Sequence, residues 1–142
     1  MPAIHFFEED IRFNLKNKNK VKAWIKATIT TEGYRLNELN YIFCSDSYLL
    51  TINQQYLAHD TYTDIITFDT SEKERVIEGD IFISIERIRE NAEKFEVGFT
   101  NELHRVIIHG ALHLLGYHDK KSADKELMTS KEDQYLGIRN FT

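Results

Sequence analysis

Hydrophobic residues recur at two spacings along the chain, and each spacing predicts a different kind of secondary structure. Short runs rich in β-branched and aromatic residues predict strands over residues 5–8, 39–45, 63–70 and 79–85. Longer stretches with apolar residues three or four positions apart predict helices over residues 18–32, 48–57, 86–95, 101–115 and 122–136. Because strands and helices are interspersed, we expect an α+β fold in which a small mixed β-sheet packs against helices.

Small polar residues and one glycine mark the ends of several predicted helices. Ser45 or Asp46 can cap the second helix, Ser84 can cap the third, and Thr100 can cap the fourth. Gly116 follows the last apolar residue of the fourth helix, and glycine readily adopts the left-handed conformation that ends a helix. The sequence therefore predicts a sharp turn directly after its most apolar helix.

Length and composition fit one domain that needs no covalent or metal reinforcement. The 142 residues suit a single core, so we expect residues 1–142 to form one domain. The only cysteine, Cys44, lies in the apolar run YIFCS, which predicts a buried thiol and fits a reducing compartment. The chain begins without a signal-peptide pattern and has no apolar run long enough to cross a membrane, so we expect a cytoplasmic protein without a membrane partner.

The distribution of charge is uneven. A net charge of -5 argues against broad nonspecific binding to nucleic acid, which requires many cationic contacts to phosphates. The segment KNKNKVKAWIK nevertheless contains five lysines and no acid, namely Lys16, Lys18, Lys20, Lys22 and Lys26. Two interpretations remain open for it, a solvated helix face and a phosphate-binding patch.

The fourth predicted helix carries residues with metal-binding chemistry. His109 and His113 stand one turn apart in a narrow sector of a helix that is otherwise apolar on most sides. Two imidazoles at this spacing can bind one ion, or they can be core histidines that each find separate hydrogen-bond partners. Asp119 follows after the turn at Gly116, and two imidazoles with one carboxylate leave a fourth position open, as catalytic zinc requires.

Three segments resemble a known family. HGALHLLGYHD is similar to the HGxLHLxGYDH signature of the YbeY family of bacterial rRNA maturation factors, described as metal-dependent endoribonucleases. INQQYLAHDTYTDIITFD resembles that family's LNxxYRxxDxPTDVLSFP, and GDIFIS resembles its GDIxIS strand. The resemblance implies a metal-dependent endoribonuclease, specific for single-stranded RNA, that acts in rRNA processing and ribosome assembly. It further implies one zinc ion per chain, with nickel as an alternative, and the small ribosomal subunit and its assembly factors as partners.

Aligned with the family signature, His109 and His113 become the first two metal ligands. The column of the third ligand, a histidine in the family, holds Asp119 here, and the preceding aspartate of the family is His118. Register favours Asp119 as the third ligand. The alternative is His118, which would require a different turn.

The resemblance also bears on the residues around the metal. Asn53 and Asp64 lie in the matched segment and are candidates to line the cleft. The family's arginine after NxxY is Leu57, which can neither bind phosphate nor stabilise charge, so catalytic competence depends on another cation such as Arg105 or Arg87.

Two other classes of function can be compared with the nuclease. A zinc protease of the HExxH type needs a glutamate next to its first histidine, and Gly110 occupies that position. A metal-stabilised ribosome assembly factor that does not cut RNA is the alternative to the enzyme, because the family arginine is absent and the net charge is low.

Overall fold

Four strands form one mixed sheet in the order β1-β2-β4-β3. The computed structural model describes residues 2–58 and 61–141. The strands are β1 (Ala3–Glu8), β2 (Arg35–Cys44), β3 (Ile65–Asp69) and β4 (Val76–Ser84). The helices are α1 (Lys18–Thr31), α2 (Asp46–Leu57), α3 (Ile85–Lys94), α4 (Phe99–Leu114) and α5 (Ser122–Gly137). β1, β2 and β4 run parallel to one another, and β3 pairs antiparallel to β4, so the predicted α+β fold with a mixed sheet is confirmed.

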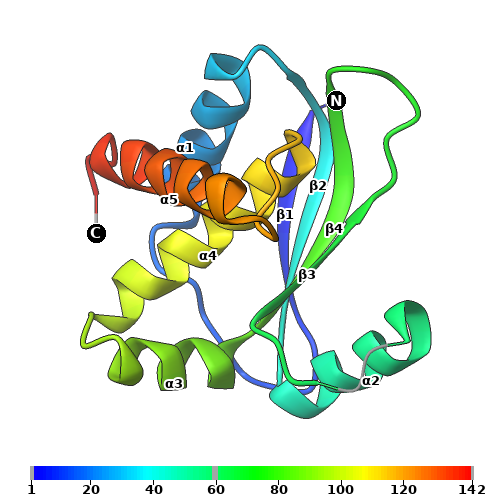
Figure 1. The fold of residues 1–142 in the computed structure, drawn as a ribbon, viewed down its shortest axis with the longest axis vertical. Coiled ribbons are helices and arrows are strands. Elements are labelled where there is room, and N and C mark those ends of the chain that lie inside the picture. Colours follow the sequence, from blue (N-terminus) through cyan, green and yellow to red (C-terminus); the bar gives the residue numbers. More distant parts are fainter. Residues whose placement is uncertain (1, 59–60, 142) are drawn as a thin grey trace.

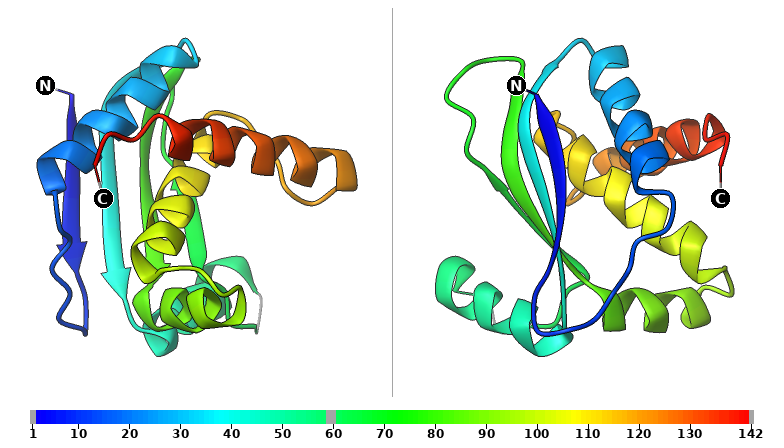
Figure 2. Two further views of the ribbon diagram at one scale, coloured as in Figure 1. Left: turned by 90° about the vertical axis from the view of Figure 1, so that its left-hand side faces the viewer. Right: turned by 180° about the vertical axis from the view of Figure 1, so that it is seen from behind.

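Helices cover the two faces of the sheet unequally. Figure 1 and the two further views in Figure 2 place α1, α4 and α5 on one side of the sheet and α2 on the other. Along β4, Ile81 and Ile83 belong to the main core with α1 and α4, whereas the intervening Phe82 packs with the smaller core beneath α2. This alternation follows from the period of two along a strand. Cys44 is fully buried in the smaller core, as predicted.

The structure agrees with two of the predicted helix caps and corrects a third. Ser45 accepts a hydrogen bond from the Tyr48 amide at the start of α2, and Ser84 does the same for the Arg87 amide at the start of α3. The prediction that Thr100 caps α4 is wrong, because the helix begins at Phe99 with Gly98 as its N-cap.

The early start of α4 has a packing reason. The side chain of Phe99 packs against the main core, where its ring lies 6.1 Å from that of Phe13, so the first turn includes this residue. β2 likewise begins at Arg35, four residues before the predicted start, because it pairs with β4 beyond the apolar run that signalled the strand. Long-range packing and pairing therefore set boundaries that local sequence does not.

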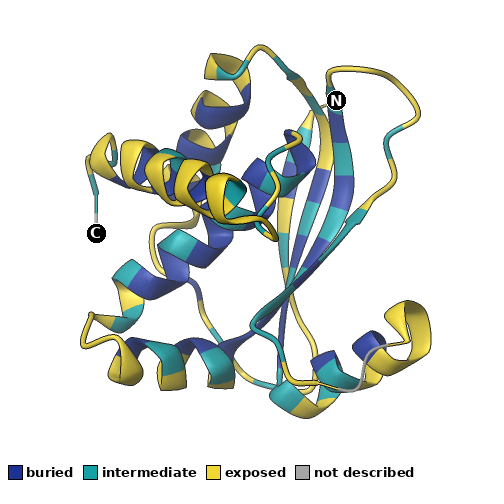
Figure 3. Cartoon of the chain, in the orientation of Figure 1, coloured by how far each residue is buried: buried dark blue, intermediate teal, exposed yellow. Residues whose placement is uncertain are grey.

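α4 is the central helix of the fold. Most of its residues are buried (Figure 3), and the Tyr41 hydroxyl from β2 donates a hydrogen bond to the carbonyl oxygen of Ile107 in its middle. The helix approaches the sheet most closely at Gly110, where an added Cβ would lie 2.9 Å from Cδ1 of Ile65 and 3.0 Å from two atoms of Ile81. Only glycine fits this contact without displacing a neighbour. None of the helices in the described part of the chain combines the length and apolar character needed to cross a membrane.

Candidate metal centre

The turn after α4 is set by Gly116. This residue has a φ of 99°, its amide donates to the carbonyl oxygen of His113, and the Tyr117 amide donates to that of Leu112. These two bonds and the left-handed glycine form a Schellman motif, as the sequence predicted for the end of this helix. The motif reverses the chain and returns the following residues toward the exposed side of the helix end.

The reversed chain brings Asp119 next to the two histidines. Oδ2 of Asp119 lies 3.2 Å from Nε2 of His109 and 3.1 Å from Nε2 of His113. The two imidazole rings are 4.6 Å apart at their centroids and nearly perpendicular, with an interplanar angle of 80°. All three side chains are partly exposed, so the donor atoms face a site that solvent can reach.

The donor set fits a divalent metal ion. One ligand atom from each of His109, His113 and Asp119 lies within 4.8 Å of the others, and among residues 2–58 and 61–141 this is the one group of histidine, cysteine and acidic side chains with such spacing. Two imidazole nitrogens and one carboxylate oxygen suit zinc, and also nickel. His118 is exposed and does not belong to the group.

Glu132 of α5 is a functional residue that sequence reasoning missed. Its Oε2 lies 2.5 Å from Nδ1 of His109, and its Oε1 accepts a hydrogen bond of 2.8 Å from Arg105. A carboxylate on the outer nitrogen of an imidazole favours the tautomer with its proton there, which leaves Nε2 free to bind a metal. The signal was weak, because Glu132 lies in a polar helix and 23 residues away from its partner.

The titration behaviour of the three grouped residues reflects these contacts. Burial acts to lower the pKa of His109, but its hydrogen bond and attraction to Glu132 outweigh burial and raise the pKa. Burial and the neighbouring His109 lower the pKa of His113. Burial acts to raise the pKa of Asp119, yet the facing imidazoles hold that pKa below its usual range. His113 as a neutral imidazole and Asp119 as a carboxylate are the forms that bind metals.

The turn that carries Asp119 is anchored by residues of two other helices, at the end of α1 and in α5. The Tyr117 hydroxyl donates to Oε1 of Glu32 at 2.5 Å, while Oε2 of Glu32 accepts hydrogen bonds from Tyr135 and from Lys131. Burial acts to raise the pKa of Glu32, but these three donors lower it, so the carboxylate stays charged. The end of α1, the turn and α5 are thereby joined through one anion.

Comparison with known proteins identifies the family. Residues 3–139 match the family described as Endoribonuclease YbeY. The chain belongs to the YbeY endoribonuclease family. This confirms the resemblance seen in the sequence, and with it the prediction of an endoribonuclease.

Relatives match almost the whole chain. An Endoribonuclease YbeY of Cytophaga hutchinsonii is 51% identical over 139 residues, covering 98% of this chain and 97% of the relative. That of Flavobacterium psychrophilum is 53% identical over 132 residues, covering 93% and 94%. The solution structure of the Thermotoga maritima protein TM1509 is similar with a TM-score of 0.65 and 28% identity, over 94% of this chain and 87% of that one.

Two further candidates from the YbeY-like segment lie in different surroundings. Asp64 precedes β3, and burial raises its pKa although the charge of the nearby His109 acts to lower it. Asn53 is buried in α2, and its side-chain amide donates to the carbonyl oxygen of Thr61 at 2.8 Å. Asn53 therefore holds the segment that leads to Asp64.

The candidate cations are already paired with carboxylates. Arg105 binds Asp133 at 2.6 Å in addition to Glu132. Arg87 binds Asp46 at 2.7 Å, and its guanidinium lies over the ring of Tyr62 at 5.3 Å. Leu57, at the end of α2, is exposed. Of the two cations, Arg105 is the one connected to the metal group, because it binds Glu132 and Glu132 contacts His109.

The remaining histidines have other surroundings. His5 is exposed on β1, 3.8 Å from the carboxylate of Glu38. His104 is buried, and its Nδ1 accepts a hydrogen bond of 2.7 Å from Arg139. His59 lies outside the described residues.

Proposed function

We propose that this protein cleaves single-stranded RNA at one metal ion held by His109, His113 and Asp119, and that it acts in rRNA maturation. The observation that carries the proposal is the convergence of the three ligand atoms at an accessible site at the end of α4. Membership of the YbeY endoribonuclease family supports RNA as the substrate. We further propose zinc as the ion, because two imidazoles and a carboxylate match a catalytic zinc site, and nickel is the alternative.

The chain's own residues prepare this site for chemistry. His109, His113 and Asp119 would hold a divalent ion that would supply a Lewis acid for the phosphodiester and make water more acidic. Glu132 fixes the tautomer of His109, and Arg105 in turn fixes the position of Glu132. Asp64 contributes a buried carboxyl with a raised pKa, which makes it a candidate proton carrier.

The geometry of α4 argues against peptide hydrolysis by the HExxH mechanism. The position that would hold the catalytic glutamate is Gly110, and even a Cβ there would meet Ile65 of the sheet. The helix face at this point is turned into the core and away from solvent. A glutamate side chain has no space in this position, so the general base of such a protease is missing.

The finer biological assignment is also part of the proposal. We place the protein in the bacterial cytoplasm with the small ribosomal subunit and its assembly factors as partners, since precursor rRNA is present there as a substrate. The family relationship supports this assignment.

The direct test compares RNA cleavage by the wild type and by His113→Ala, each purified identically and loaded with zinc. The proposal expects multiple turnovers on single-stranded RNA for the wild type and a loss of at least about 100-fold in the variant, because one of the three ligands is removed. His118→Ala is the matched control and is expected to retain activity. Equal activity in wild type and His113→Ala would point to a contaminating ribonuclease and refute the proposal.

A further inference from the structure

The surroundings of the metal group contain more carboxylates than cations. Burial and the negative charge of Asp64 raise the pKa of Glu102, and Glu132 acts on both of these acids in the same direction. Arg105, the cation among them, is already bound to Glu132 and Asp133. These acidic side chains do not attract the phosphates of an RNA strand, apart from any phosphate that the metal ion itself binds. Affinity for a longer stretch of the strand requires further cations, beyond the exposed Lys120 and Lys121 that follow Asp119 in the turn.

The lysines at α1 form a surface of the opposite character. We call Lys16, Lys18, Lys20, Lys22 and Lys26 the basic strip. All but Lys22 are exposed, and Lys22 is partly so, with its ammonium over the ring of Phe6 at 5.8 Å. Throughout the described ranges, none of the five forms an ion pair with an acid. On a chain with a net charge of -5, five cations without an ion pair on and just before one helix are a marked local excess.

The spacing of the strip suits a phosphodiester chain. Lys18, Lys22 and Lys26 are four residues apart, so they lie on one side of α1 about 6 Å apart along its axis. That rise is comparable to the separation of successive phosphates in an extended strand. Like charges at this spacing destabilise a helix, and a bound polyanion relieves this repulsion. The arrangement is therefore complementary to a row of phosphates.

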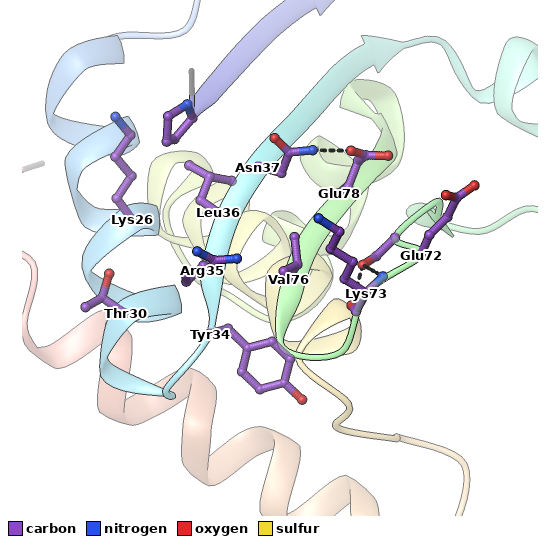
Figure 4. A pocket seen from close by; sticks show the side chains of 12 residues that line it. Lys26, Thr30, Tyr34, Arg35, Leu36, Asn37, Glu72, Lys73, Val76 and Glu78 are labelled. Atoms are coloured by element: carbon purple, nitrogen blue, oxygen red, sulfur yellow. Dashed lines mark hydrogen bonds between the residues drawn. The ribbon is translucent and has the colours of Figure 1, made fainter.

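At the end of the strip, Lys26 reaches an open pocket of about 770 Å³ between α1, the starts of β2 and β4, and the segment before β4. Figure 4 shows Lys26, Arg35 and Lys73 around this pocket on three different elements. Of the two acids that line it, Glu78 is bound by the side chain of Asn37, as the dashed line in Figure 4 indicates. The cationic track thus continues from the helix onto the end of the sheet at which β2 and β4 begin.

We propose that the basic strip is a second RNA-binding surface, which holds the phosphate backbone of the substrate away from the metal group. The proposal rests on the RNA-cleaving function proposed above and extends it. α1 lies above the β1 side of the sheet, whereas the metal group lies on the side of α4 that faces α5 (Figures 1 and 2). The strip therefore contacts a part of the RNA distant from the cleaved bond, and it favours substrates long enough to reach both surfaces.

The test compares two charge-matched double variants of the full chain. Lys22→Gln/Lys26→Gln removes two cations from the strip, and Lys94→Gln/Lys125→Gln removes two exposed cations elsewhere. Binding of a single-stranded oligouridylate of about 20 nucleotides is measured by fluorescence anisotropy in chelator, where no cleavage occurs, over a range of salt concentrations. KM and kcat are then measured on zinc-loaded protein.

The strip variant is expected to bind about tenfold more weakly at low salt, and the slope of log K against log salt is expected to fall by between about 1 and 2. Its KM should rise without a change in kcat, while the control variant matches the wild type. Equal affinities and slopes for the two double variants would overturn the proposal. That result is distinguishable from failure of the nuclease assignment, which is decided by cleavage in His113→Ala and not by any lysine variant.

Discussion

Replacing Glu132 by glutamine tests whether this residue positions a metal ligand. The substitution keeps the size of the side chain and an oxygen that can accept a hydrogen bond from Nδ1 of His109. It removes the negative charge that makes this hydrogen bond strong. In the structure Glu132 is 9% exposed and contacts His109 at 2.5 Å and Arg105 at 2.8 Å, so little solvent screens either interaction. Both contacts weaken in the variant.

The expected effect is a loss of metal affinity. Removing the outer-shell partner of a metal-bound histidine typically weakens binding by about 10- to 100-fold, which corresponds to about 1 to 3 kcal/mol. Because His109 is one of the three proposed ligands and Glu132 is its only partner on Nδ1 in the described part of the chain, we expect a value within this range.

A competition titration with a chromophoric zinc chelator at pH 7.5 or near it measures the affinity. Asp133→Asn is the matched control, because Asp133 also binds Arg105 but does not touch a histidine. We expect zinc affinity to fall in Glu132→Gln and to stay within about twofold of wild type in Asp133→Asn. A Glu132→Gln protein that binds zinc as tightly as the wild type would refute the positioning role, and equal losses in both variants would assign the effect to Arg105.

Three further predictions concern other parts of the fold. Burial lowers the pKa of His104 from 6.5 to about 4, so below pH 6.5 the unfolded chain takes up a proton that the folded chain does not. Between pH 6.5 and 4 the free energy of unfolding of the wild type, measured with urea, should therefore fall by up to about 3 kcal/mol more than that of His104→Asn. The same dependence of this free energy on pH in both proteins would contradict the prediction. Tyr117→Phe should weaken zinc binding several-fold, because its hydroxyl anchors the turn that carries Asp119. Tyr135→Phe removes another donor to Glu32 and should lower the free energy of unfolding by about 1 kcal/mol but leave zinc binding unchanged. Weaker zinc binding in Tyr135→Phe than in Tyr117→Phe would rule out this anchoring role. Gly110→Ala should destabilise the protein by about 1 to 3 kcal/mol despite its better helix propensity, a result that a gain in melting temperature would exclude.

The parts of the site that follow from local sequence were predictable. The histidine spacing, the apolar helix and the glycine that ends it are all contained in eleven consecutive residues, and each has a short-range physical meaning. The Schellman motif at Gly116 needs only the chain around it, which is why the approach of Asp119 to the end of α4 was foreseen.

The parts that depend on tertiary packing were not predictable. Glu132 and Glu32 reach the site from other helices, and nothing in their own neighbourhoods distinguishes them from solvated acids. The start of α4 at Phe99 was missed for the same reason, because packing of this ring against the core overrides the capping preference of Thr100. Local rules find a motif, while the residues that orient it emerge only from the fold.

The most direct test of the central claim is the amount of metal bound per chain in wild type, Asp119→Ala and His118→Ala after incubation with zinc and removal of excess ion. We expect about one zinc ion per chain for wild type and His118→Ala, and loss of the ion in Asp119→Ala, because Asp119 faces both imidazoles and His118 does not belong to the group. An ion retained in Asp119→Ala and lost in His118→Ala, or a wild type that binds no metal, would contradict the claim.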